Sequence, residues 1–175
     1  VNLCKINGED SSNLKFKIYN VEHHLTHIAS AYYLSKFTET TAALSYDGSG
    51  DAVSIMLAEC KDNKIKVLDR VFLPKSLGHF YSAICNFIGF DKFGEEYKVM
   101  GLSAYGEDKY SEYFNELIGY DSKLIVRQKN IFNYNSINYK KNHIIKLDNS
   151  IFQNKSVEKF SKDSKDIAKS LQVSF

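Results

Sequence analysis

TTAALSYDGSGDAVSIMLAEC, residues Thr40 to Cys60, holds two β-strand candidates on either side of a glycine-rich turn. The first, TTAALSYD, ends at Asp47, and the second, DAVSIMLAEC, ends at Cys60. The DGSG between them has a composition that commonly joins antiparallel strands. A third candidate, KIKVLDRVFL, ends at Leu73 and is separated from the second by KDNK, another turn composition. The pattern predicts an antiparallel meander of three strands.

The segments before the meander predict a strand followed by a helix. LKFKIYNV, Leu14 to Val21, alternates apolar and polar residues, as a strand with one buried face does. From His23 to about Lys36 the apolar residues recur at helical spacing: Leu25, Ile28, Ala29, Tyr32 and Tyr33. We expect this helix to follow the strand directly.

The segments after the meander predict mainly helices. Pro74, the only proline, precedes a helix expected over about Ser76 to Ile88. A short helix is expected in KYSEYFNELIG, and another in the last stretch from Ser164 to Phe175. Between those two helices, LIVRQ and HIIKL are candidates for short strands.

The composition is that of a globular domain, with 175 residues of which 43% are hydrophobic. Lys and Arg number 23 against 21 Asp and Glu, and these charges are scattered, which gives no support to a nucleic-acid-binding surface. The locally basic YKKNHIIKL lacks arginine and is interpreted as a solvated face. No apolar run approaches the roughly 20 residues that cross a bilayer. We expect a soluble cytoplasmic protein with neither nucleic acid nor membrane as partner.

The cysteines and the chain ends add two expectations. Cys4, Cys60 and Cys85 are an odd number without a CxxC pair, which predicts reduced cysteines rather than disulfides or a thiolate zinc site. The chain opens with VNLCKING, without an initiator methionine, and stops at DIAKSLQVSF, inside an amphipathic helix pattern. We therefore expect it to be an excerpt from a longer protein.

Three of the five histidines lie in HHLTH, at the start of the first predicted helix. His23 and His27 are four residues apart, so their rings can project from one helix face and bind one first-row metal ion. His24 and His27, three apart, can do the same, and the spacing does not choose the pair. In the alternative, one histidine caps the helix or satisfies a core polar group while the others face water. Two histidines are also an incomplete site, because a tight metal site usually needs a carboxylate.

Asp47 is the candidate carboxylate. It ends an apolar strand and is followed by Gly48, Ser49 and Gly50. A glycine turn at a strand end exposes backbone N–H groups and can approach phosphate closely, because glycine has no obstructing side chain. The simpler alternative is an ordinary hairpin.

GEEYKVMGLSAYG, Gly94 to Gly106, is the third candidate segment. Lys98 stands out in it because an ammonium can neutralise phosphate as a point charge. An amphipathic surface helix with ordinary caps has a similar composition. His79, in SLGHFYSA, is interpreted as a packed or capping residue.

Four segments in this order, VEHHLTHIASAYY, ALSYDGSGD, LPKSLGHFYSAICNFIGF and GEEYKVMGLSAYG, resemble the N-terminal domain of the O-carbamoyltransferases of the NodU/CmcH type. The resemblance runs from about Val21 to Gly106 and returns at DIAKSLQ; LSAYG, at Ser103, departs from a more usual LAPYG. It implies an α/β, actin-like (ribonuclease-H-like) fold, a mixed sheet with flanking helices, here incomplete. Residues 1–38 would end the first actin-like lobe with the strand and the histidine helix, and residues 39–175 would form a second lobe truncated at the C-terminus.

The resemblance also implies a site. Its metal pair, usually for iron or another divalent metal, maps onto His23 and His27, with Asp47 as third ligand or nucleotide contact. The implied cofactor-binding residues are those of the strand-end turn: Asp47, Gly48, Ser49 and Gly50. Catalytic roles are implied for Asp47 and Lys98, and a further aspartate would come from a C-terminal portion outside this chain.

The implied reaction transfers a carbamoyl group from carbamoyl phosphate to a hydroxyl of a sugar-like or natural-product acceptor. ATP is used through a carbamoyl-adenylate made in a second domain of the full-length protein, so the fragment alone is expected to be inactive. The metal would polarise an oxygen of the adenylate or position the acceptor hydroxyl, while the glycine turn and Lys98 would stabilise phosphate charge. Two alternatives remain: an actin-like-fold sugar or acid kinase, and a non-catalytic nucleotide- or metal-binding module with structural histidines.

Overall fold

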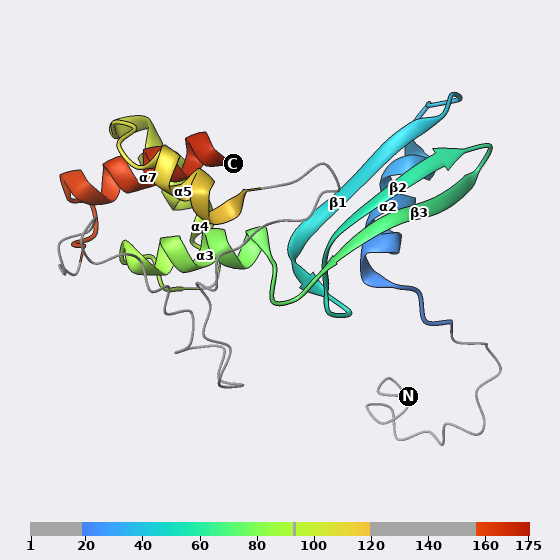
Figure 1. Cartoon of the computed structure of the whole chain (residues 1–175), viewed down its shortest axis with the longest axis horizontal. Helices are drawn as coiled ribbons and strands as arrows, with labels where there is room; N and C mark the ends of the chain where they lie inside the picture. The colour runs from blue at the N-terminus through green and yellow to red at the C-terminus, as the bar shows by residue number, and fades with distance from the viewer. Residues whose placement is uncertain (1–18, 93, 120–156) are drawn as a thin grey trace, which may run out of the picture.

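The computed structural model describes residues 19–92, 94–119 and 157–175, which form a mixed α/β structure. Its sheet is a three-stranded antiparallel meander in the order β1-β2-β3, made of β1 (Thr41–Gly50), β2 (Val53–Lys61) and β3 (Lys64–Phe72). The described α-helices are α2 (His23–Leu34), α3 (Leu77–Phe87), α4 (Glu96–Leu102), α5 (Ser111–Ile118) and α7 (Lys162–Ser174), with a 3-10 turn η2 (Ser103–Tyr105). Figure 1 shows α2 lying along the sheet and the other helices gathered in a group beside it, beyond β1.

The three predicted strands are confirmed, but the first turn is shorter than predicted. DGSG was expected to form it, whereas β1 continues to Gly50 and the turn consists of Asp51 and Ala52. Both turn residues have positive φ, 52° and 64°, as a type I′ hairpin requires. This turn type is favoured because its twist matches that of the flanking strands. Asp62 and Asn63, with φ of 50° and 57°, form the second turn in the same way.

Because the turn is only Asp51 and Ala52, the preceding residues Asp47–Ser49 belong to β1, where they form a bulge. Tyr46 pairs with Ile55 and Gly50 with Val53, so Asp47–Ser49 lies opposite the single residue Ser54. A bulge interrupts the ladder and redirects side chains, and it is often found beside functional sites. The Ser54 hydroxyl bonds outside the ladder, to the carbonyls of Val71 and Lys75.

Helix α2 packs across the face of the sheet. Ile28 and Tyr32 lie in one core cluster with three buried residues of β2: Met56, Ala58 and Cys60. The helix predicted from His23 is thus confirmed, with Tyr33 on its exposed side. Of the strand predicted over Leu14 to Val21, residues 19–21 are not in a strand, and the rest lies outside the described residues.

Helix α3 connects the helical group to the bulge. Ser76 caps it: its Oγ accepts a hydrogen bond from the His79 N–H (3.1 Å) and donates one to the carbonyl of Gly48 (2.6 Å). A Cβ at Gly78 would lie only 2.7 Å from the Gly48 nitrogen and 2.8 Å from the Asp47 carbonyl oxygen. Only glycine at this position lets the helix approach the strand backbone so closely.

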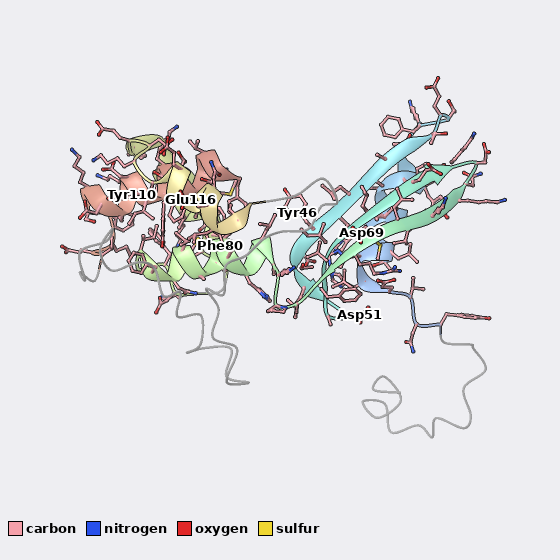
Figure 2. All side chains as sticks on the ribbon, in the orientation of Figure 1. Tyr46, Asp51, Asp69, Phe80, Tyr110 and Glu116 are labelled. Atoms are coloured by element: carbon pink, nitrogen blue, oxygen red, sulfur yellow. The ribbon has the colours of Figure 1, made fainter. Side chains whose placement is uncertain are left out.

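The larger core lies among α3, α4, α5 and α7. Phe80, labelled in Figure 2, is fully buried there with residues of the other helices: Val99, Phe114, Ile167 and Leu171. The predicted helices at KYSEYFNELIG and at the last stretch are therefore confirmed as α5 and α7. The candidate strands LIVRQ and HIIKL lie outside the described residues.

The buried carboxylate of Asp166 on α7 binds the loop that follows η2. Asp166 is 2% exposed, and its Oδ1 accepts a hydrogen bond from the Glu107 N–H (2.9 Å) while its Oδ2 pairs with Lys109 Nζ. Burial opposes ionisation of Asp166, but the hydrogen bonds from Lys109 and Glu107 outweigh it and hold the pKa of this carboxyl below its usual value. A Cβ at Gly106 would overlap the backbone of Lys165, so the loop and α7 are in close contact.

Within the described ranges, no helix has both the length and the apolar character needed to span a bilayer. Cys60 and Cys85 are buried and unbridged, and burial raises the pKa of Cys85 to about 12. The expectation of reduced cysteines is met at these two positions; Cys4 lies outside the described residues.

We expect Asp166→Ala to lower the free energy of unfolding by about 2 kcal/mol at pH 7, because the charged hydrogen bonds of a buried acceptor are lost. Since its pKa is lowered by folding, the Asp166 contribution is complete above the pKa of the unfolded carboxyl and is lost as the pH falls through the lowered value. Urea unfolding from pH 7 to acid measures both effects. Glu107→Ala, whose side chain is 71% exposed, is the control, and an equal loss in both variants would contradict this role of Asp166.

Candidate metal centre

Three side chains converge where α2 meets the bulge of β1. His23 Nε2 lies 2.8 Å from Asp47 Oδ2, and His27 Nε2 lies 3.0 Å from His23 Nε2 and 3.5 Å from Asp47 Oδ2. The helix brings the two rings together because residues four apart share a face, and the bulge carries the carboxylate to them. The structure therefore brings together the two histidines of the HxxxH motif and the predicted carboxylate.

His24 does not belong to this group, because both of its ring nitrogens are used in the core. Its ring is fully buried, with Nε2 2.9 Å from the carbonyl oxygen of Val53 and Nδ1 2.8 Å from Ser45 Oγ. A carbonyl can only accept, so Nε2 carries the proton and Nδ1 accepts from the Ser45 hydroxyl. Of the two histidine pairs that the sequence spacing left open, the structure brings His23 and His27 together beside Asp47, and their binding of a metal stays a prediction. The alternative of a histidine satisfying a core polar group is true of His24.

The cluster fits a divalent first-row metal ion. Ligand bonds of 2.0–2.2 Å imply distances between neighbouring ligand atoms of about 2.8 to 3.5 Å, and the three distances here are 2.8, 3.0 and 3.5 Å. The other carboxylate oxygen, Asp47 Oδ1, is buried and has no hydrogen-bond partner among the described residues. Two imidazoles and one carboxylate form a donor set that suits iron or zinc. The side chains of His23, His27 and Asp47 are 39%, 53% and 36% exposed, which leaves coordination positions open to water or substrate.

An ion pair fixes the entry to α2. Glu22, directly before His23, accepts two hydrogen bonds from Arg70 on β3, from Nε to Oε1 (2.8 Å) and from Nη2 to Oε2 (2.9 Å). The hydrogen bond from Arg70 lowers the pKa of Glu22. The bidentate geometry restrains orientation as well as distance.

A groove of about 360 Å³ runs between α2 and β1 and reaches the cluster. His27 and Asp47 lie at its walls together with mainly apolar residues: Ile28, Ala31, Tyr32, Phe37, Ala43, Leu44 and Tyr46. The groove was not predicted from the sequence, because its walls come from two elements whose relative position depends on tertiary packing.

The predicted cofactor-binding glycines have packing roles in the structure. A Cβ at Gly48 would come within 3.2 Å of the His79 ring, and a Cβ at Gly50 would overlap the ring of His23. Ser49 is the half-buried third residue of the bulge. A phosphate contact at Gly48, Ser49 or Gly50 remains a prediction.

Lys98 lies apart from the cluster, on α4. Its Nζ pairs with Glu95 Oε1 at 2.8 Å, and this hydrogen bond raises the pKa of Lys98. It also borders a hollow of about 330 Å³ whose other lining residues are Leu102, Tyr105, Phe160 and Lys165. Among the described residues, no hydrogen bond or ion pair joins Lys98 to α2 or β1, so its predicted catalytic role stays a prediction.

Comparison with known proteins finds a matching family model and several similar proteins. A family model described as carbamoyltransferase N-terminus matches residues 4–175. The nodulation protein NolNO of Sinorhizobium fredii is 39% identical over 98 residues, which are 56% of this chain and 14% of that protein. Protein sll1178 of Synechocystis is 42% identical over 89 residues, 51% of this chain and 14% of its own length. Protein MJ1051 of Methanocaldococcus jannaschii is 32% identical over 140 residues, 69% of this chain and 27% of its own. The chain thus spans only a small part of each relative.

We expect His24→Ala to lower the free energy of unfolding of the metal-free protein by about 2–4 kcal/mol, because it leaves a cavity and unpairs Ser45 and Val53. His27→Ala removes a half-exposed ring and should change the free energy of unfolding by less than about 0.5 kcal/mol. Urea unfolding in the presence of a chelator compares the two variants. Equal stability of both would show that His24 is not a core residue.

Proposed function

The chain belongs to the family of carbamoyltransferase N-terminal domains, and on this premise we propose that it forms the metal- and nucleotide-binding part of an enzyme that carbamoylates a hydroxyl group. The observation that carries the proposal is the convergence of His23, His27 and Asp47 within 4.8 Å of one another. A kinase of similar architecture would not need the histidine pair.

The three ligand residues would hold a divalent metal ion and orient the substrate beside it. When bound, a divalent metal supplies Lewis acidity, which polarises a carbonyl oxygen or positions a hydroxyl. His23 and His27 offer neutral nitrogen donors from a rigid helix, and Asp47 adds the negative charge that favours a cation. Because these side chains are partly exposed on one side and backed by the core on the other, substrate would approach from the groove between α2 and β1.

The donor of the carbamoyl group is proposed to be carbamoyl-adenylate, made from carbamoyl phosphate, ATP and water by another domain of a longer protein, with release of phosphate and pyrophosphate. Transfer of the carbamoyl group to the acceptor hydroxyl would then release AMP. The short span of this chain within its relatives supports such a division of labour. Lys98, which its pairing with Glu95 keeps protonated, would stabilise phosphate charge of the nucleotide. The acceptor is proposed to be the hydroxyl of a sugar-like or natural-product molecule.

An actin-like architecture is the fold we propose for the complete lobes, with the meander opening the second lobe. The outer edge of β1 has no paired strand among the described residues, and such an edge can accept a further strand. We propose that the remainder of the longer protein extends the sheet there and completes the nucleotide cleft.

The metal assignment predicts that His23→Ala, His27→Ala and Asp47→Asn each weaken Fe²⁺ binding by at least about 100-fold, since the first two remove a nitrogen ligand and the third replaces a charged carboxylate ligand by a neutral amide. Anaerobic reconstitution followed by gel filtration and metal analysis measures this. Asp69→Asn is the matched carboxylate control, because among the described residues the Asp69 side chain accepts a hydrogen bond only from the neighbouring Arg70 N–H on β3. Iron retained equally by all five proteins would count against the centre.

For the reaction, we expect Asp47→Asn in the full-length protein to abolish carbamoyl transfer, while pyrophosphate is still released from ATP in the presence of carbamoyl phosphate. Lys98→Ala should lower transfer by about 10- to 100-fold, as the loss of a charged hydrogen bond does, and Lys64→Ala, at the first residue of β3, should not. The two steps are measured as released pyrophosphate and as radiolabel carried from carbamoyl phosphate to the acceptor. Undiminished transfer by Asp47→Asn would exclude this function for the site.

A further inference from the structure

Helix α2 begins without a capping side chain of its own. Glu22, in the N-cap position, makes no side-chain cap bond and is instead engaged by Arg70. The first helical N–H, that of His23, donates to Asp51 Oδ2 at 2.8 Å. Figure 2 shows Asp51 at the tip of the β1–β2 hairpin, beside the start of α2. The hairpin thus supplies the cap, and a carboxylate at a helix N-terminus is also favoured by the helix dipole.

The same hairpin holds His23 at two further points. Asp47, four residues before Asp51, lies 2.8 Å from the Nε2 of the same histidine. Gly50 lies between them in the sequence, and a Cβ there would overlap the Cβ and ring of His23. One hairpin therefore contacts the backbone nitrogen, the Cβ and the ring tip of a single residue.

His23 needs such restraint more than His27 does. It is the first residue of α2, where helices fray because the initial N–H groups have no intrahelical acceptor. His27 lies one turn further in, where the helical hydrogen bonds already fix its backbone. Loss of the Asp51 contact would release the His23 backbone and, with it, the 3.0 Å separation of the two Nε2 atoms.

We propose that Asp51 is a positioning residue of the metal centre, which acts by fixing the backbone of His23 rather than by binding the metal. The inference rests on the metal site of the proposed function. Asp51 is not one of the three groups whose donor atoms converge. Residues that orient metal ligands typically contribute about 10- to 100-fold to metal affinity.

The chain contains a matched control for Asp51. Asp62 occupies the same position in the β2–β3 turn, with φ of 50° against 52° at Asp51. Among the described residues, its side chain has no hydrogen bond or ion pair. Glycine at either position relieves the positive φ, so Asp51→Gly and Asp62→Gly differ only in the contact with His23. Asp51→Asn keeps an acceptor oxygen and tolerates positive φ, and serves as the conservative rescue.

The experiment measures Co²⁺ affinity and the visible Co²⁺ spectrum of the full-length protein and its three variants. Asp51→Gly should weaken Co²⁺ binding by about 10-fold or more and alter the spectrum, because His23 is no longer oriented. Asp51→Asn should stay within about threefold of wild type, and Asp62→Gly within about twofold. Hydrogen exchange without metal should be faster at the start of α2 in Asp51→Gly alone.

The outcomes separate this inference from the function on which it rests. If wild type binds Co²⁺ and Asp51→Gly binds it equally well with the same spectrum, the positioning role is overturned and the metal centre stands. Equal weakening by Asp51→Gly and Asp62→Gly would also overturn it, because turn stability would then be the cause. If wild type and all variants bind no Co²⁺, the metal centre is overturned, and the positioning role with it.

Discussion

Helices α2 and α3 contact the sheet at the same short bulge, Asp47–Ser49, and the arrangement of the whole molecule depends on that contact. On one side, the Asp47 carboxylate meets the rings of α2. On the other, Gly78 and the Ser76 cap of α3 lie directly against the bulge backbone. Because α3 also belongs to the core of the helical group, the bulge links that group to the metal-ligand cluster. A shift of α3 would therefore be transmitted through rigid backbone contacts rather than through flexible side chains.

The buried ring of His24 fixes the position of α2 on the sheet and therefore the positions of the exposed rings of His23 and His27. Its two hydrogen bonds, to Ser45 on β1 and to the backbone of Val53 on β2, fix both the rotation and the height of α2 on the sheet. Its immediate neighbour His23 and the next-turn His27 are then held at the edge of the same interface. A buried ring whose two nitrogens are both hydrogen-bonded allows only one orientation of the helix, because any other orientation would leave a nitrogen unpaired. Apolar packing alone does not restrict the orientation in this way. In HHLTH, the core histidine His24 and the two candidate metal ligands His23 and His27 thus have distinct positions on the helix.

Much of this was accessible from the sequence, because the determining patterns are local. The meander follows from two turn compositions between apolar runs, and α2 follows from apolar spacing. The choice between His23 and His24 could also have been made: His24 lies four residues before Ile28 and eight before Tyr32, in the buried stripe of the helix. The bulge could not be predicted, because it depends on the register of Tyr46 and Ile55 and on close packing by Gly78. The partner of Lys98 is Glu95, three residues earlier, so this pair is a local pattern that the sequence could have indicated. The cap from Asp51 could not be predicted, because it depends on how the β1–β2 hairpin packs against α2.

The two outer strands of the meander differ in a way that bears on how the protein must be handled. Strand β3 carries four charged residues, Lys64, Lys66, Asp69 and Arg70, whereas β1 has none from Thr41 to Tyr46 and exposes Leu44 and Tyr46. Charges on an edge strand oppose pairing with a strand of another chain, whereas an uncharged apolar edge strand favours such pairing. If the domain is expressed apart from the longer polypeptide, we expect the β1 edge, which has no paired strand among the described residues, to be the place where two copies pair edge to edge.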